Sequence, residues 1–124
     1  QTQDKKETSV WCLANLDDVK LTMSNSKFPS ENIHYVEGKV EDTIPVTVPA
    51  GPIALLRLDT DWYTSTKHEL IHLYPSVSAK GVIIIDDYGH WEGCRKAVDE
   101  YFAEQKQTIF LQRIDYTGRL AIKK

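Results

Sequence analysis

The sequence predicts an α/β fold, an open and mostly parallel sheet with a hairpin at one edge. Two nearly continuous apolar runs, Ile53–Leu58 and residues 82–85, flank a helical segment that stops at Pro75. Apolar runs without alternation indicate strands that are covered on both faces, as in parallel sheets. Two such strands joined by a helix make a βαβ unit, the basic element of sheets of this kind.

The N-terminal third is expected to hold a loop, a helix and a short strand. Residues 1–8 are polar without periodicity, which indicates a loop. Leu16–Asn25 is predicted to be a helix, because apolar residues recur on one face and Asn15 with Asp18 matches a capping box. Residues 33–38 form a short apolar run between Asn and Gly, which predicts a strand.

The remainder supplies two helices and the hairpin. Helices are predicted over residues 66–74 and 93–104, and a hairpin over 108–114 and Arg119–Ile122, with a turn at residues 115–118. The second helix has an apolar stripe at helical spacing, made of Cys94, Ala97, Val98, Tyr101 and Phe102. Such a stripe is typical of core packing.

Composition excludes several classes of protein. The chain has 124 residues, 27% of them charged, and a formal net charge of −3, as in a single soluble globular domain. Mild acidity without a Lys/Arg run argues against a nucleic-acid partner. No apolar stretch approaches the ~20 residues that cross a bilayer, so no membrane partner is expected. Cys12 and Cys94 have no metal-type or redox-type spacing, which predicts reduced thiols in a cytoplasmic protein.

Both central strands end in aspartates. Asp59 and Asp61 follow the first strand, and Asp86 with Asp87 follows the second. Parallel neighbours place their carboxyl ends at one edge of the sheet, so Asp59, Asp86 and Asp87 are expected to converge. Converging carboxylates repel one another unless a cation lies among them, and all-oxygen ligation favours Mg²⁺. A single aspartate at a strand end is often only a helix cap, but two acidic strand ends favour metal or acid–base chemistry.

Other polar and aromatic side chains follow the same strands. His90 is a candidate base or substrate contact, or simply a surface residue. The aromatic residues of this rim either form a binding wall or close the top of the core; they are Trp62, Tyr63, Tyr88 and Trp91.

Four ordered motifs resemble the macrocin O-methyltransferase (TylF) family. They are the runs at residues 32–45, 58–66, 81–89 and 94–99. The resemblance implies a Rossmann-like class I methyltransferase sheet, with S-adenosylmethionine as methyl donor and Mg²⁺ as metal. It also implies a small-molecule acceptor, the hydroxyl of a sugar on a natural product such as a macrolide or aminocoumarin antibiotic. Relatives commonly pair, so a homo-oligomer is an open expectation.

The resemblance also assigns roles to residues. It implies metal binding by Asp59, Asp86 and Asp87, and donor binding by Glu41, Asp42 and Asp59. Asp61 matches the proposed general base, with His90 as the alternative. Asp61 lies two residues beyond Asp59, so it is expected to face the same cleft while staying off the metal.

One part of the family pattern is missing. No Gly-rich G-x-G-x-x-G turn for the donor occurs anywhere in the chain. The chain begins with Gln1, and Met23 is its only methionine. We therefore expect a single truncated domain, residues 1–124, the C-terminal part of a methyltransferase, which by itself binds the metal weakly and the donor poorly or not at all. The strand at 33–38 would then lie at the far edge of the family's sheet.

Three other readings share the acidic motif. Haloacid-dehalogenase-type phosphatases begin with Asp-x-Asp, although the interval between Asp61 and Asp86 is too short for their intervening motifs. Sugar-nucleotide glycosyltransferases also use Asp-x-Asp, but do not need the second acidic strand end. A non-catalytic α/β domain with an acidic pocket, such as a phosphate receiver, has its acidic residues in the reverse order.

Overall fold

The structure is a computed structural model that describes residues 14–124. The predictions for the loop at residues 1–8 and for Cys12 therefore lie outside the described residues. The chain divides into two compact units, Gln1–Lys39 and Val40–Lys124. Each unit is treated by itself below.

The described part of the first unit contains helix α1, Leu16–Asn25, with the predicted bounds. The side chain of Asn15 accepts a hydrogen bond from the Asp18 backbone N–H at 2.8 Å, and the Asp18 carboxylate accepts one from the Asn15 N–H at 3.4 Å. These two bonds satisfy donors that the first turn of a helix leaves without partners. The capping box is therefore confirmed. A short 3₁₀ helix, η3 at Ser30–Asn32, follows.

The strand predicted at residues 33–38 is wrong, since this segment is irregular. A strand needs a hydrogen-bonded neighbour, and no described strand pairs with these residues. Tyr35 and Val36 are also largely exposed, so the segment buries no apolar face that would fix it in an extended form.

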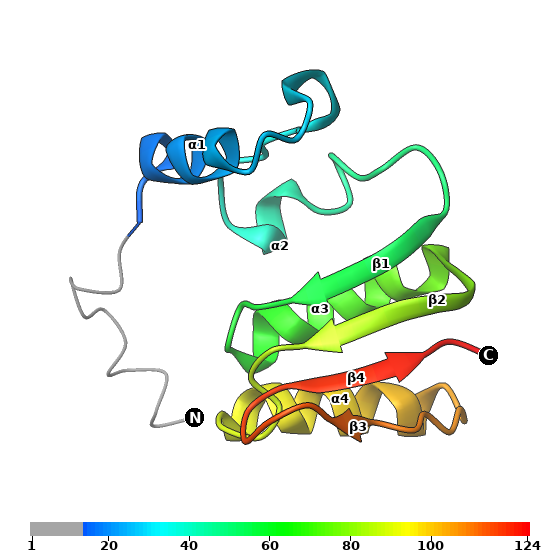
Figure 1. Ribbon diagram of the computed structural model, residues 1–124. Helices are drawn as coiled ribbons and strands as arrows, with labels where there is room; N and C mark the ends of the chain where they lie inside the picture. The colour runs from blue at the N-terminus through cyan, green and yellow to red at the C-terminus, as the bar shows by residue number, and fades with distance from the viewer. Residues whose placement is uncertain (1–13) are drawn as a thin grey trace. The chain divides into compact units, whose positions relative to one another are not determined.

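The second unit is built on a four-stranded mixed sheet in the order β1-β2-β4-β3 (Figure 1). Strands β1, Ile53–Leu58, and β2, Val77–Ile85, pair in parallel. Strand β4, Arg119–Ile122, pairs antiparallel with β2 and with β3, Gln112–Arg113. The α/β class, the parallel central pair and the C-terminal hairpin are confirmed. β2 begins five residues before the predicted run, and β3 is shorter than predicted.

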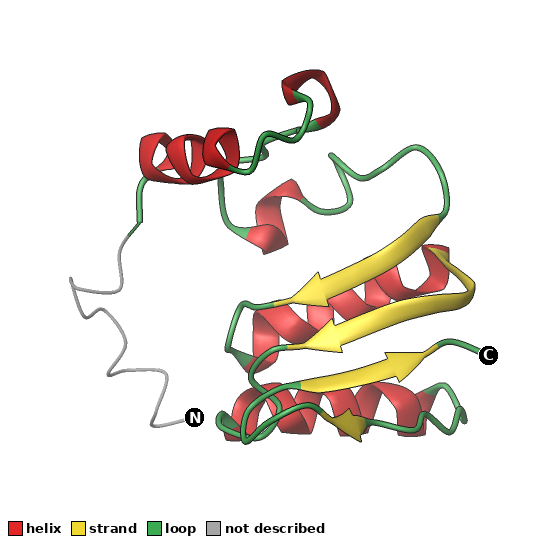
Figure 2. Ribbon diagram, in the orientation of Figure 1, coloured by secondary structure: helices red, strands yellow, loops and turns green. Residues whose placement is uncertain are grey.

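Two long helices lie together on one face of this sheet, behind the strands in the view of Figure 2. Helix α3, Tyr63–Leu73, begins three residues before the prediction, and the 3₁₀ helix η4, Tyr74–Ser76, follows it. Helix α4, Glu92–Glu104, agrees with its prediction to one residue. The short helix α2, Val40–Thr43, has no counterpart in the prediction. No helix in residues 14–124 is long and apolar enough to cross a membrane.

The core lies between the sheet and these two helices. β1 and β2 alternate in burial, and the predicted stripe of α4 is fully buried. The largest side chains with no exposure are Leu70, Ile83, Ile85, Val98 and Thr66. On the opposite face, Leu55 of β1 is 57% exposed and Ile122 of β4 is 61% exposed. The prediction of strands covered on both faces is therefore wrong for the described residues, because both long helices pack on the same side.

The carboxyl ends of β1 and β2 meet at one edge of the sheet. Leu58 is in register with Ile85, and the backbone N–H of Asp86 donates to the Leu58 carbonyl at 2.9 Å. The loops that follow the two strands therefore start side by side, with α3 and α4 beginning just beyond them.

Candidate functional site

Asp59, Asp86 and Asp87 form an acidic cluster at this edge of the sheet. One carboxylate oxygen from each lies within 4.8 Å of the others. Among the described residues, this is the one group of three or more side chains that could share a metal ion. The convergence predicted from the two strand ends is what the geometry shows.

Arg57 lies beside two members of the acidic cluster. Its guanidinium Nη2 is 2.8 Å from Asp86 Oδ1 and 3.0 Å from Asp59 Oδ2. The hydrogen bond from Arg57 holds the pKa of Asp86 below its usual range. Burial, together with the neighbouring Asp86, raises the pKa of Asp59. The cluster thus has one side-chain cation at its exposed side.

Asp87 is the least satisfied of the three. Its Oδ2 atom is the one buried side-chain oxygen or nitrogen in residues 14–124 without a hydrogen-bond partner. Burial raises the pKa of Asp87 to about 8, and a hydrogen bond with Asp61 and the charges of Asp86 and Asp59 act in the same direction. These effects favour the protonated form of Asp87 at neutral pH.

Asp61 reaches the cluster through Asp87. Its backbone has a φ angle of 67°, in the left-handed region that non-glycine residues seldom adopt. The N–H of Trp62 donates to the Thr60 carbonyl at 2.7 Å, which closes a tight turn around Asp61. Asp61 interacts with Asp87, while Asp59 interacts with both Asp86 and Asp87.

The loop that carries Asp86 and Asp87 is held by its neighbours. The Tyr88 ring contacts the guanidinium groups of Arg95 and Arg119, each 5.4 Å from the ring centroid. The Tyr88 hydroxyl donates to Asp99 Oδ1 of α4 at 2.6 Å. Gly89 approaches the Tyr116 carbonyl so closely that a Cβ would collide with it. These contacts hold the loop against α4 and the hairpin turn.

The aromatic rim has mixed roles. Trp62 and Trp91 pack together with ring centroids 5.5 Å apart. Tyr88 and Trp91 pack against the core, which fits the reading that they close its top. The Tyr63 hydroxyl donates to Glu100 of α4 at 2.8 Å.

The remaining predicted site residues lie outside the acidic cluster. Glu41 and Asp42 are exposed in α2, and the strand that they were expected to follow does not form. His90 is exposed and packs edge-on against Trp91, with ring centroids 4.6 Å apart. None of the three belongs to the group of possible metal ligands in the described chain.

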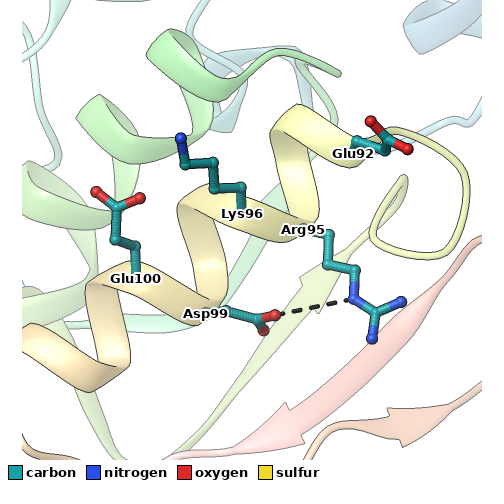
Figure 3. Close-up of a pocket in the computed structure, with 5 residues that line it drawn as sticks. All are labelled: Glu92, Arg95, Lys96, Asp99 and Glu100. Carbon is teal, nitrogen blue, oxygen red and sulfur yellow. Dashed lines mark ion pairs between the residues drawn. The ribbon is translucent and has the colours of Figure 1, made fainter. Parts of the chain in front are cut away.

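The exposed surface of α4 has a shallow hollow of about 530 Å³ (Figure 3). It is lined by Glu92, Arg95, Lys96, Asp99 and Glu100. Its charges are of both signs, and Arg95 pairs with Asp99 at 3.8 Å. A mixed and paired set of this kind is typical of a solvated helix face, so the hollow is no candidate for chemistry.

Two residues near the site were missed by the sequence analysis. Arg57 stands in an apolar run, and its place two residues before Asp59 could have shown that both share one face of the strand. Glu69 of α3 is buried and accepts a hydrogen bond from Thr60 at 2.9 Å. No local pattern marks a helical glutamate as buried.

The residues of the acidic cluster fit a hard divalent cation. They offer three carboxylates, which are the ligands that Mg²⁺ prefers. The unpartnered Asp87 oxygen lacks a donor or positive group, and Arg57 neutralises only the Asp59 and Asp86 side of the cluster.

The chain matches known proteins along most of its length. The profile of the macrocin-O-methyltransferase (TylF) family matches residues 1–122. The chain is 40% identical over 102 residues to demethyldecarbamoylnovobiocin O-methyltransferase of Streptomyces niveus, covering 82% of this chain and 38% of that protein. It is 34% identical over 103 residues to 8-demethyl-8-(2,3-dimethoxy-alpha-L-rhamnosyl)-tetracenomycin-C 4'-O-methyltransferase of Streptomyces olivaceus, covering 83% and 39%.

A solved structure agrees with these matches. The O-methyltransferase NovP superposes with a TM-score of 0.83 and 35% identity, over 90% of this chain and 46% of NovP. The chain thus spans less than half the length of the relatives that it matches.

Proposed function

The chain belongs to the macrocin O-methyltransferase family, and on that premise we propose that its protein methylates a hydroxyl of a sugar or sugar-bearing natural product. S-adenosylmethionine is the methyl donor that this family implies. The rhamnosyl 4'-O-methyltransferase among the relatives supports a sugar hydroxyl as the acceptor. The observation that carries the proposal for this chain is the convergence of Asp59, Asp86 and Asp87 where the two central strands end.

In the proposed mechanism, Asp59, Asp86 and Asp87 hold Mg²⁺. A bound Mg²⁺ supplies charge that orients an acceptor hydroxyl and lowers its pKa. Holding the cation requires that Asp87 lose its proton, because its protonated carboxyl is a poor ligand. Asp61, which interacts with Asp87, would then lie next to an acceptor hydroxyl oriented at the cluster.

Asp61 is proposed as the general base. A sugar hydroxyl is a poor nucleophile at neutral pH, so a carboxylate that takes its proton during methyl transfer accelerates the reaction. The tight turn around Asp61 and the interaction of its side chain with Asp87 support this role. His90 remains the alternative base, although its ring packs on Trp91.

Donor binding is proposed for Glu41, Asp42 and Asp59. Glu41 and Asp42 are exposed carboxylates in the first turn of α2, and Asp59 follows the end of β1. Ribose hydroxyls and the adenine amine donate hydrogen bonds that such carboxylates can accept.

The proposal is tested by methyl transfer. The protein that contains this chain, incubated with methyl-labelled S-adenosylmethionine and Mg²⁺, is expected to transfer label to the sugar of a rhamnosylated aromatic polyketide. A matching acceptor whose sugar hydroxyls are already methylated is the control. Label on the aglycone alone, or release of phosphate from a sugar phosphate without any methyl transfer, would contradict the proposal.

The metal site is tested by calorimetric titration of this chain with Mg²⁺. Asp86→Asn removes a ligand charge and is expected to weaken Mg²⁺ binding by about tenfold or more. Loss of a residue that merely hydrogen-bonds to a metal ligand often weakens metal binding by that much. Asp17→Asn on α1 is the matched control, because it removes an exposed aspartate outside the cluster. Equal affinities for Asp86→Asn and the unaltered chain would rule out Asp86 as a ligand.

The base assignment is tested by Asp61→Asn. This variant is expected to lower turnover of the protein that contains the chain by about 10²-fold or more, the usual contribution of a general base, while Mg²⁺ affinity changes little. His90→Gln is the comparison variant. If His90→Gln loses turnover and Asp61→Asn does not, the base is His90.

A further inference from the structure

Glu69 is a buried carboxylate that the proposed mechanism does not use. It lies on α3 and is 5% exposed. Burial raises its pKa to about 7. A buried carboxyl group with a neutral partner costs free energy that an apolar side chain in the same place would not. Packing alone therefore gives no reason for a glutamate here.

The partner of Glu69 is Thr60, the residue between Asp59 and Asp61. The Thr60 hydroxyl donates to Glu69 Oε2 at 2.9 Å. The Thr60 carbonyl accepts from the Trp62 N–H at 2.7 Å and from the Ser65 hydroxyl at 3.2 Å. Both the side chain and the backbone of Thr60 are thus fixed to α3 and its first turn.

The hydrogen bonds of Thr60 help to maintain the backbone conformation of Asp61. A φ angle of 67° disfavours a non-glycine residue, so the turn persists only where its surroundings hold it. Besides the Ser65 hydroxyl, this turn is tied to the buried part of α3 by the hydrogen bond from Thr60 to Glu69. Without it, Asp61 is expected to relax toward ordinary backbone angles and to leave Asp87.

We propose that Glu69 is a positioning residue: through its hydrogen bond with Thr60, it holds the turn that presents Asp59 to the cation and Asp61 to the acceptor. The inference that the turn serves a cation and an acceptor rests on the proposed function. The inference that Glu69 holds the turn rests on the contacts alone.

The test is a double-mutant cycle between Glu69 and Thr60 in this chain. Amide hydrogen exchange at Trp62 reports the turn, exchange at Ile83 in β2 reports the fold, and calorimetry reports Mg²⁺ binding. Glu69→Leu and Thr60→Val are each expected to speed exchange at Trp62 by about tenfold, the factor that one hydrogen bond supplies, with exchange at Ile83 unchanged. The double variant is expected to match either single variant, because both remove the same bond.

Conservative variants separate positioning from general support of the core. Glu69→Gln keeps an acceptor for Thr60 and Thr60→Ser keeps the donor, so both are expected to retain slow exchange at Trp62. Glu104→Leu, on the exposed side of α4, is the matched control for loss of a glutamate. In the variants that free the turn, Mg²⁺ affinity is expected to fall by a similar factor.

Three results of the exchange measurements would each overturn the inference. Unchanged exchange at Trp62 in Glu69→Leu, or strictly additive effects in the double variant, would overturn the inference. Failure of Glu69→Gln to retain slow exchange would overturn it as well. If the unaltered chain takes up no Mg²⁺ while the exchange cycle gives the expected coupling, the role of Glu69 in holding the turn stands and the proposed metal site fails.

Discussion

At the scale of single residues, Arg57 decides how the acidic cluster is neutralised. Side chains two apart along a strand share a face, so Arg57 and Asp59 of the β1 end point to the same side. The guanidinium lies between Asp59 and Asp86, which are two of the proposed metal ligands. A cation that binds these carboxylates must therefore displace Arg57 from at least one of them.

Arg57→Gln is accordingly expected to tighten Mg²⁺ binding. The side chain is 53% exposed, and exposed ion pairs contribute up to about 1 kcal/mol, so the gain is about two- to fivefold. Calorimetric titration of this chain at constant ionic strength measures it. Arg113→Gln on β3 makes the same change of charge at the far edge of the sheet and serves as the control. Weaker binding in Arg57→Gln would show that the guanidinium supports the metal site instead of competing for it.

The sequence predicted the aspartates of the site but not the residues around them. Asp59, Asp86 and Asp87 follow apolar strands directly, and that local pattern is enough to place them at one edge of a parallel pair. The contact of Arg57 with Asp86 depends on the register between two strands, and the burial of Glu69 depends on how α3 packs. Neither is encoded in the spacing of nearby residues.

At the scale of elements, Lys123 links the end of β4 to the segment that precedes β2. Its ammonium donates to the carbonyls of Tyr74, Pro75 and Val77 at 3.1, 3.3 and 2.7 Å. It also lies 4.8 Å from the centroid of the Tyr74 ring. Tyr74 and Pro75 lie in η4, where α3 ends; the Tyr74 carbonyl also accepts from the Val77 N–H, so Lys123 adds to the hydrogen bonding of this segment. The Lys123 side chain thus donates hydrogen bonds to three backbone carbonyls where the chain passes from helix to strand.

Lys123→Met is expected to lower the free energy of unfolding by about 1–3 kcal/mol, because it keeps most of the aliphatic stem but removes hydrogen bonds made by a charged donor. Urea unfolding of this chain, followed by far-UV circular dichroism, measures the change. Lys124→Met removes the same charge from the next residue, which is exposed, and is expected to change stability by less than about 0.5 kcal/mol. Equal effects of the two substitutions would indicate that only the loss of charge matters.

The accuracy of the predicted elements follows from how local their signals are. α1 has a capping box and β1 a compact apolar run, and both have the predicted bounds. α3 begins earlier than predicted because Trp62, its N-cap residue, makes no side-chain cap that the sequence could reveal. The segment at residues 33–38 has an apolar composition but no strand beside it in the described chain, so composition alone was misleading.

At the scale of the whole molecule, the acidic cluster and Glu69 couple stability to pH. The pKa values of Asp87 and Glu69 are raised by burial to about 8 and about 7 in the folded chain, against ordinary values near 4. Between these limits the folded state binds protons that the unfolded state has released. The free energy of unfolding therefore falls as pH rises from about 4 to about 8, and this part of the stability is fully present only at the acidic end.

In the absence of divalent cations, the melting temperature of this chain is therefore expected to fall between about pH 5 and about pH 8, because Asp87 and Glu69 must ionise within the fold. Asp87→Asn is expected to flatten the decline, since an amide does not titrate, and Asp17→Asn is expected to leave it unchanged. Saturating Mg²⁺ stabilises only the ionised cluster, so its effect on the melting temperature is expected to be larger at the alkaline end. Differential scanning calorimetry in EDTA and in Mg²⁺ across this range makes the measurement. A melting temperature that rises toward pH 8 in EDTA would mean that these carboxyl groups are not protonated in the folded chain. An effect of Mg²⁺ on the melting temperature that is independent of pH would mean that the cation does not compete with the proton on Asp87.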